Sequence, residues 1–381
     1  MKRKTLPSNN ELKGLKVTVL HLTTVHPISD VRIYQRECRS IATQQNYYLL
    51  LAGPGEHPSH PECHLISLPN PFHNRMLRFL QSQFVAIHVW LKYRPGLLHI
   101  HDPELLLFGL FVSCVFKQKV IWDAHEDYVA QILEGAKSWI PPSCKLFIAR
   151  LLKSLLEQVD RQFTAVIGAT EYICSLYSNP NTVLVGNETR ISDFENAKPD
   201  LNGKQVLFIG ALNEQSLFLE VVKAVAELEG VHLAVAGHRT NRDLWEPAKE
   251  ILGGRLIELG YLSPEGLVEA ISKSALGMVT YKPREFHVTS SPTKFFEFAA
   301  AGLPIIAVPI EMNISLISNA KNGLLTDGFT SMDLAKAISS ALSDRSQLRK
   351  WSSNGRIWSH SNGNWSLSES RLLSVYSVLL N

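Results

Sequence analysis

Short apolar runs alternate with segments of helical periodicity along almost the whole chain, and this alternation constrains the fold most strongly. Continuous apolar runs are typical of parallel strands whose two faces are both covered by helices. The pattern therefore predicts an α/β fold with parallel sheets. The predicted strands are Val17–Leu22, Tyr48–Ala52, Leu97–Ile100, Val120–Trp122 and Ala165–Ile167 in the first half, and Val206–Ile209, His232–Ala236, Leu256–Leu259, Leu276–Val279 and Ile305–Val308 in the second.

The length of 381 residues favours two domains of ordinary size. Residues 186–204 are polar and poorly periodic, which is typical of a linker. We expect a first domain at 15–188, a second at 189–360, and a last amphipathic helix within 361–381. Further helices are predicted at Leu217–Leu228, Asp243–Leu252, Pro264–Ser272 and Ser331–Leu342, and a buried helix at Leu105–Phe116.

Composition excludes several classes of protein. Hydrophobic residues make up 45% and charged residues 19%, which is typical of a globular chain. The formal net charge of +3 divides into +5 for residues 1–190 and −2 for the rest, too weak a basic balance for a nucleic-acid surface. No apolar run is long enough to span a membrane, and the five cysteines show no metal-binding spacing. We expect a cytoplasmic protein with reduced cysteines.

The segment 290–307 predicts an anion site. Ser291 is the expected N-cap and Pro292 the first residue of a helix that ends near Gly302. A helix N-terminus presents unpaired N–H groups to an anion, and Lys294 adds a full charge there. Glu297, one turn further on, is placed to accept hydrogen bonds from sugar hydroxyls. Phosphate beside a diol describes a nucleotide-linked sugar.

Polar groups also follow the predicted strands of the first half, where ligands bind in open α/β sheets. The segment 23–32 follows the first strand, His101 and Asp102 end another, 123–127 follow a third, and Asn187 comes before the linker. His99 and His101 should share one face of their strand, with His99 in a structural role. Asp102 should point the opposite way and orient a loop if the strand continues.

In order and spacing, these segments resemble glycosyltransferase family 4 over residues 17–328. The resemblance implies the GT-B fold: two Rossmann-like, doubly wound parallel-sheet domains that face a cleft, with the last helix crossing back to the first. It also implies a retaining, metal-independent transfer of a hexose-type sugar from a nucleoside diphosphate to a glycan or lipid-linked acceptor. No further cofactor and no nucleic acid are expected.

The expected site residues follow from these motifs together with the resemblance. His101 and Lys294 are the catalytic candidates, the first to activate or position the acceptor and the second to stabilise the leaving group. The donor-binding candidates are Glu297, Ser291, Pro292, Thr293, Gly210 and Arg284. The acceptor-binding candidates are His26, Asp30, Arg32, Asp102, His125 and Glu126.

Two departures from the family pattern keep alternatives open. Members commonly clamp the pyrophosphate with an Arg and a Lys after the first strand of the second domain, but 209–216 contain neither, and Thr289 replaces a frequent acidic residue. An epimerase or hydrolase on the same fold, or a non-catalytic nucleotide-sugar-binding protein, therefore remains an alternative. Metal ligation is not expected, because no His or Cys cluster has zinc spacing.

Two segments of the first half carry basic and apolar residues without any acidic residue. They are 71–101, with Arg75 and Arg78, and 137–156, with Arg150 and Lys153. Basic amphipathic segments with aromatic residues can lie in a membrane interface. The alternative is a pair of core-packed helices with a basic outer face. The first interpretation predicts peripheral contact with an anionic inner membrane surface.

Overall fold

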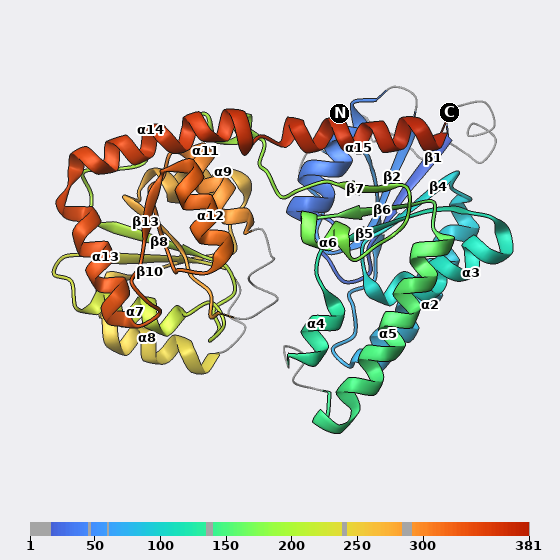
Figure 1. The fold of residues 1–381 in the computed structure, drawn as a ribbon, viewed down its shortest axis with the longest axis horizontal. Helices are drawn as coiled ribbons and strands as arrows, with labels where there is room; N and C mark the ends of the chain where they lie inside the picture. The colour runs from blue at the N-terminus through green and yellow to red at the C-terminus, as the bar shows by residue number, and fades with distance from the viewer. Residues whose placement is uncertain are drawn as a thin grey trace. The chain divides into compact units, whose positions relative to one another are not determined.

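The computed structural model describes residues 17–44, 47–58, 61–134, 140–237, 242–283 and 292–380. The chain forms two compact units (Figure 1). The first domain comprises Met1–Gly186 together with Leu367–Asn381, and the second comprises Asn187–Ser366. The chain therefore passes from the first domain to the second after Gly186 and returns to the first domain at Leu367.

The first domain is built on a seven-stranded parallel sheet with strand order β3-β2-β1-β4-β5-β6-β7. Each predicted strand of this half is present. Two outer strands, β3 and β7, were not predicted, because they are short and only partly buried and so lack a continuous apolar run. The strands are β1 (Val17–Leu22), β2 (Tyr47–Pro54), β3 (His64–Leu68), β4 (Leu97–Ile100), β5 (Lys119–Ala124), β6 (Ala165–Gly168) and β7 (Thr182–Leu184).

Helices connect these strands in chain order. Leu98, Ile100 and Trp122 face one hydrophobic core, into which the helices α2, α3 and α5 insert their apolar sides. The helical elements are η1 (Val31–Cys38), α1 (Arg39–Ala42), α2 (Arg75–Tyr93), η2 (Pro103–Leu105), α3 (Leu106–Phe116), α4 (Tyr128–Leu133), α5 (Pro142–Gln162) and α6 (Glu171–Ser175).

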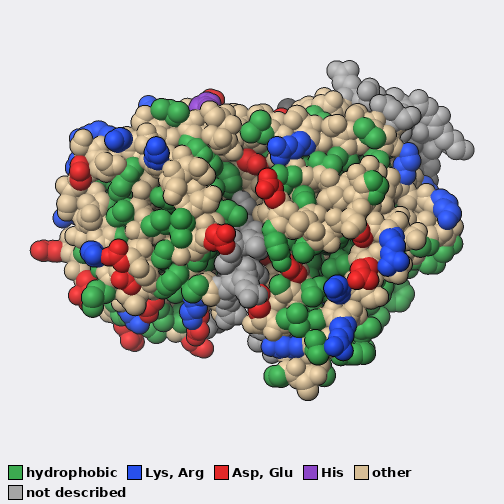
Figure 2. Space-filling model, viewed as in Figure 1, with side chains coloured by type: hydrophobic (Ala, Val, Ile, Leu, Met, Phe, Trp, Pro, Cys, Tyr) green, Lys and Arg blue, Asp and Glu red, His purple; other side chains and the backbone are tan. Residues whose placement is uncertain are grey.

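The expectation that α3 is a buried helix is wrong for one of its faces. Leu106, Phe108 and Val112 are buried, whereas Phe111 is 51% exposed and Val115 is 59% exposed. The helix contacts both α2 and α5, and these two also carry exposed apolar side chains. Figure 2 shows hydrophobic side chains beside Lys and Arg on this part of the first domain. None of the described helices has the length and apolar character needed to cross a membrane.

The second domain is built on a six-stranded parallel sheet with strand order β10-β9-β8-β11-β12-β13. All five predicted strands are present, and the short β13 at the edge was missed. The strands are β8 (Gln205–Ile209), β9 (His232–Ala236), β10 (Leu256–Gly260), β11 (Leu276–Val279), β12 (Ile305–Ala307) and β13 (Gly323–Leu325).

The helices of the second domain cover both faces of its sheet, because side chains from alternate strand positions fill two separate cores. The helix α11 begins at Thr293, so Pro292 is its N-cap and not its first residue as predicted. The helical elements are η3 (Ile191–Phe194), α7 (Phe218–Ala226), η4 (Arg242–Leu244), α8 (Trp245–Leu252), η5 (Gly253–Arg255), α9 (Pro264–Ser272), α11 (Thr293–Ala301), α12 (Glu311–Ala320), α13 (Ser331–Ser343) and α14 (Arg345–Asn362). The helix that follows them, α15 (Trp365–Leu380), belongs to the first domain from Leu367 onward.

The last helix, α15, returns to the first domain, as predicted. Leu372 and Tyr376 on this helix are fully buried. The hydroxyl of Ser368 accepts a hydrogen bond from the backbone N–H of Gly186 at 2.8 Å. The C-terminal segment is therefore part of the packed structure of the first domain.

Candidate functional site

Strand register gathers histidines at the centre of the first sheet. The strand order changes direction between β1 and β4, and ligands of open α/β sheets bind beyond the carboxyl ends of strands at such a point. His21 on β1 lies directly opposite His99 on β4. His101 follows on the same face as His99, as predicted, and their ring centroids are 4.5 Å apart.

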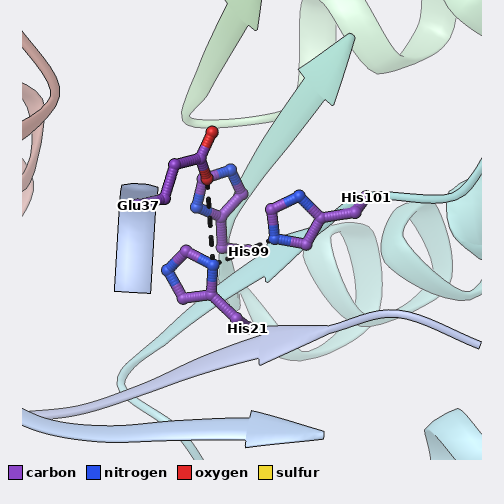
Figure 3. A group of neighbouring side chains, drawn as sticks. All are labelled: His21, Glu37, His99 and His101. Carbon is purple, nitrogen blue, oxygen red and sulfur yellow. Dashed lines mark hydrogen bonds and ion pairs between the residues drawn. The ribbon is translucent and has the colours of Figure 1, made fainter. Parts of the chain in front are cut away.

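His101 is fully buried, which changes the role expected for it (Figure 3). Its Nδ1 lies 3.0 Å from Asp123 Oδ2, and its Nε2 lies 2.9 Å from His21 Nδ1. Both ring nitrogens are therefore used inside the protein, and neither is available to a substrate hydroxyl in this conformation. Burial lowers the pKa of His101 despite the neighbouring carboxylate, so the ring is neutral.

Asp123 connects the buried groups to the surface. It forms two hydrogen bonds with the guanidinium of Arg32, at 2.7 and 3.1 Å, and accepts one from His125 Nε2 at 2.6 Å. Burial alone would raise its pKa, but the charges of Arg32 and His125 and the hydrogen bond from His101 hold the pKa well below its usual range. Asp123 is therefore an ionised carboxylate that orients two histidines.

Arg32 was predicted to bind the acceptor, and the structure gives it internal partners. Besides Asp123, its guanidinium donates to the carbonyl oxygens of Val185 and Gly186, at 2.9 and 3.2 Å. The side chain is almost completely buried. It therefore ties the loop after β7 to the carboxyl ends of the central strands.

Asp102 orients the loop after β1, as the sequence suggested. One carboxylate oxygen accepts hydrogen bonds from the backbone N–H groups of Thr24 and Val25, and the Thr23 hydroxyl donates to the same oxygen at 3.0 Å. The side chain of Asp102 is buried. Its contribution to an acceptor site therefore passes through the loop that it holds.

His26 lies in this loop and is 37% exposed at its side chain. Its Nδ1 is 3.7 Å from Asp30 Oδ2, and its Nε2 is 3.6 Å from Asp102 Oδ1. Burial lowers the pKa of His26, but the bond to Asp30 and the charges of Asp30, Asp102 and Glu126 outweigh it and raise the pKa to about 9. Asp30 also caps η1 by accepting from the backbone N–H groups of Arg32 and Ile33.

His125 and Glu126 lie at the end of β5. His125 keeps 15% of its side chain exposed, whereas the side chains of His101 and Asp123 are inaccessible. Glu126 is exposed and accepts a hydrogen bond from Gln131 at 2.6 Å. Of the acceptor-binding candidates, His26, Asp30, His125 and Glu126 therefore keep part of their side chains accessible, whereas Arg32 and Asp102 are buried.

In the second domain, the strand order reverses between β8 and β11. Gly210 follows β8 with a φ of +133°, a conformation that favours glycine. A Cβ on Gly237, which follows β9, would lie 2.0 Å from the carbonyl oxygen of Gly210. Both positions thus require glycine, and they leave bare backbone at the carboxyl end of the sheet.

Lys294 reaches this backbone from α11. Its Nζ donates to the carbonyl oxygen of Ile209 at 3.1 Å and lies 4.5 Å from the centre of the Tyr281 ring. A Cβ built on Gly210 would be 3.8 Å from the same Nζ. Burial lowers the pKa of Lys294 to about 7, although the carboxylate of Glu297 acts in the opposite direction. A buried ammonium of this kind binds an anion readily, because an anion restores its charged form.

The other donor-site candidates divide into two groups. Pro292, Thr293 and Glu297 lie at or near the start of α11, and Glu297 is 8% exposed. Arg284 and Ser291 lie outside the described residues. The structure therefore places Gly210, Lys294 and the start of α11 at the carboxyl end of the second sheet.

Sequence reasoning missed four residues of the first site: His21, Glu37, Asp123 and Tyr376. Asp123 stands in a motif that was recognised, but only its neighbours were selected. His21 occupies a strand position that reads as part of an apolar run. Glu37 and Tyr376 come from helices and reach the cluster through packing that no local pattern shows.

Comparison with known proteins adds a family match in the second domain. Residues 189–358 match the family model of the glycosyl transferases group 1. No curated protein sequence matches the chain.

Solved structures with a similar fold cover nearly the whole chain. Sucrose-phosphate synthase from Thermosynechococcus elongatus has a TM-score of 0.72 and 17% identity, over 96% of this chain and 99% of that one. Anabaena Alr3699/HepE in complex with UDP-glucose has a TM-score of 0.72 and 13% identity, over 95% and 100%. WaaG, a glycosyltransferase involved in lipopolysaccharide biosynthesis, has a TM-score of 0.72 and 13% identity, over 94% and 99%. The predicted GT-B fold is confirmed.

Proposed function

We propose that this protein is a glycosyltransferase that moves a hexose-type sugar from a nucleoside diphosphate to a glycan or lipid-linked acceptor. The match of residues 189–358 to the glycosyl transferases group 1 model and the GT-B fold support the proposal. The observation that carries the proposal is the buried ammonium of Lys294 beside the bare backbone of Gly210. A diphosphate there would meet a positive charge and a close approach to the main chain.

Lys294 also accounts for the missing pyrophosphate clamp. The segment after β8 has no Arg or Lys, yet Lys294 places its charge at the end of that strand from another element. The N-terminus of α11, which has no side-chain cap among the described residues, adds backbone N–H groups beside it. Together they would stabilise the negative charge that develops on the leaving diphosphate.

Glu297 lies one turn along α11 from Thr293, at a distance from the phosphates that suits the ribose. A carboxylate accepts two hydrogen bonds from a diol, so Glu297 binds the ribose hydroxyls in this proposal. The helix terminus and Lys294 supply the charge that a divalent cation supplies in other transferases, and the reaction proceeds without metal and with retention at the anomeric carbon.

On the first domain, His26 and His125 serve the acceptor, and His101 positions His125 through Asp123. His26 is cationic at neutral pH and accessible, which suits the phosphate of a lipid-linked acceptor. His125 is held by Asp123 at 2.6 Å and orients the acceptor hydroxyl. This replaces the direct catalytic role that the sequence suggested for His101.

A lipid-linked acceptor agrees with the outer face of the first domain. Met76 and Phe84 on α2 are 75% and 73% exposed, and Phe147 on α5 is 65% exposed. The outer faces of these helices are therefore apolar as well as basic. The alternative interpretation, core-packed helices, predicted an outer face that is basic only. Arg78 is partly neutralised, since it pairs with Glu104 at 2.7 Å, but Arg150 is exposed beside the apolar residues. We expect this face to contact an anionic membrane surface.

The proposal is tested by calorimetric titration with UDP-glucose, the ligand named for the Anabaena structure, and with GDP-mannose. Lys294→Ala and Glu297→Ala should each weaken binding by about tenfold or more, because each removes a hydrogen bond that involves a charged group. Lys282→Ala, which removes a loop lysine that is 40% exposed at its side chain and pairs with Glu214, is the matched control. Equal affinity in all four proteins for whichever donor binds would refute the donor site.

Turnover tests the acceptor side. His125→Ala should lower kcat while the affinity for the nucleotide sugar stays unchanged, because the nucleotide binds to the second domain. His88→Ala, which changes an exposed histidine on α2, is the control. Release of free sugar or an epimer without any acceptor would instead favour a hydrolase or epimerase.

A further inference from the structure

A cluster of ligand-type side chains lies inside the first domain, beneath the accessible histidines. His21, His99, His101 and Glu37 are all fully buried, and each offers one nitrogen or oxygen atom within 4.8 Å of the others (Figure 3). His21 lies on β1, Glu37 on η1, His99 on β4, and His101 directly after β4. The expectation of no metal site considered only spacing along the sequence, which does not detect such a group.

Each imidazole ring is anchored through one nitrogen by a residue outside the cluster. His101 Nδ1 pairs with Asp123 at 3.0 Å. His21 Nε2 and His99 Nδ1 both meet the hydroxyl of Tyr376, at 2.8 and 2.6 Å. Histidines that bind metals are usually held in this way, with the second nitrogen fixed by a carboxylate or another polar group.

The remaining atoms of the cluster are poorly satisfied without a further partner. His99 Nε2 and both carboxylate oxygens of Glu37 are buried, and none has a hydrogen-bond partner among the described residues. Glu37 Oε2 lies 4.0 Å from His21 Nδ1, and Oε1 lies 3.3 Å from Arg32 Nε. Buried polar atoms without partners are rare in folded proteins and call for an explanation.

The hydrogen bonds of the network fix the positions of its protons, because both oxygens of Asp123 already accept from the guanidinium of Arg32. His101 Nδ1–H donates to it, so His101 Nε2 carries a lone pair and accepts the proton of His21 Nδ1–H. His21 Nε2 then accepts from the Tyr376 hydroxyl, whose oxygen accepts from His99 Nδ1–H. This assignment leaves an unshared lone pair on His99 Nε2. The ring nitrogens His99 Nε2 and His101 Nε2 are therefore both unprotonated, as metal binding requires.

We propose that His21, His99, His101 and Glu37 bind a structural Zn²⁺ ion. Three imidazole nitrogens and one carboxylate oxygen are ligands that zinc accepts, and a site with four protein ligands is closed and structural. His21 would carry its proton on Nε2, facing the Tyr376 oxygen, and its Nδ1 lone pair would bind the metal. The 2.9 Å separation of His21 Nδ1 and His101 Nε2 widens to about 3.3 Å when two nitrogens bind one tetrahedral zinc at about 2.0–2.1 Å.

The surrounding charges are compatible with the ion. Burial and the charge of Asp123 raise the pKa of Glu37 in the absence of an ion, and Glu37 would become a carboxylate when zinc binds. Asp123 is the second carboxylate, and Arg32, which lies against both, brings one positive charge. All four ligands are buried, so the ion would not touch the sugar or the nucleotide. The proposal concerns the stability of the first domain and is independent of the metal-free transfer reaction.

The test is the zinc content of the intact protein, produced in zinc-supplemented medium and dialysed against metal-free buffer. Elemental analysis should find about one zinc per chain in the wild type and in His88→Gln, which changes an exposed histidine of the same domain. Glu37→Gln and His99→Gln should lose zinc affinity by at least about 100-fold and retain little metal after dialysis.

A second readout separates metal binding from folding. Circular dichroism in the presence of a chelator shows whether each variant is folded, and replacement with Co²⁺ should give the visible absorption of a tetrahedral site in the wild type only. A folded wild type without zinc, or equal zinc in the folded variants and the wild type, would overturn the proposal. Neither result depends on glycosyl transfer, so failure here leaves the proposed function untouched.

Discussion

The pKa of Lys294 predicts that nucleotide-sugar binding depends on pH. Burial lowers this pKa to about 7, so at pH 8 the free protein carries mostly neutral Lys294. If the diphosphate binds the ammonium, the pKa of Lys294 is higher in the complex than in the free protein. Binding above pH 7 is then accompanied by the uptake of a proton. The affinity should then fall by about tenfold between pH 6 and pH 8, since each further pH unit above the free pKa corresponds to about 1.4 kcal/mol.

Titration calorimetry with UDP-glucose measures the affinity. Repeating the titration in two buffers of different ionisation enthalpy gives the number of protons taken up, because the observed heat then differs by that number times the difference in ionisation enthalpy. UDP-glucose has no phosphate group that titrates near pH 7, so the group that takes up a proton from the buffer must belong to the protein. About half a proton per site should be taken up at pH 7, and about 0.9 at pH 8.

Two variants make the reasoning refutable. Lys294→Arg keeps its charge at every pH tested, so its affinity should be flat between pH 6 and pH 8. Lys282→Arg, which changes a partly exposed lysine paired with Glu214, should keep the wild-type dependence. A wild-type affinity that does not change with pH, or a slope that survives in Lys294→Arg, would show that Lys294 does not bind the diphosphate.

Three further outcomes follow from the first domain. Tyr376→Phe leaves two buried histidine nitrogens without their partner, so the free energy of unfolding should drop by about 2–4 kcal/mol in chelator-containing buffer; an unchanged denaturant midpoint would contradict the network. Asp102→Asn should weaken the loop that holds His26, seen as faster amide exchange of residues 24–26, and unchanged protection would argue against that role. Co-sedimentation with anionic vesicles should decline with salt and when Arg150 and Lys153 are changed to Gln, since each basic group near such a surface adds about 1 kcal/mol; wild-type protein that stays in the supernatant at low salt would end the membrane proposal.

Much of the fold could be predicted because a buried strand forms a continuous apolar run in the sequence. The runs that form β4 and β11 matched to the residue. The strands β3, β7 and β13 escaped because edge strands are short and half-buried, so they need no continuous apolar run. The shared face of His99 and His101 followed from the alternation of side chains along a strand.

The site was less predictable, because its chemistry depends on contacts between distant parts of the chain. Arg32 and Asp123 are 91 positions apart, and His99 and Tyr376 are 277 apart. No local pattern states that Arg32 turns inward or that both nitrogens of His101 are occupied. The sequence motifs correctly indicated the carboxyl end of the sheet. Burial, which no motif shows, decides which side chains at that end a substrate can reach.

The position of Tyr376 near the end of the chain has a consequence for synthesis. The first domain acquires this side chain only after some 190 further residues have left the ribosome, or roughly 10–40 s at about 5–20 residues per second. During that interval its central histidines lack the hydroxyl that pairs two of them, and the surface that α15 later covers is open. A nascent first domain is therefore exposed to proteases and chaperones until α15 has been synthesised, and a chain that stops before α15 leaves it incomplete.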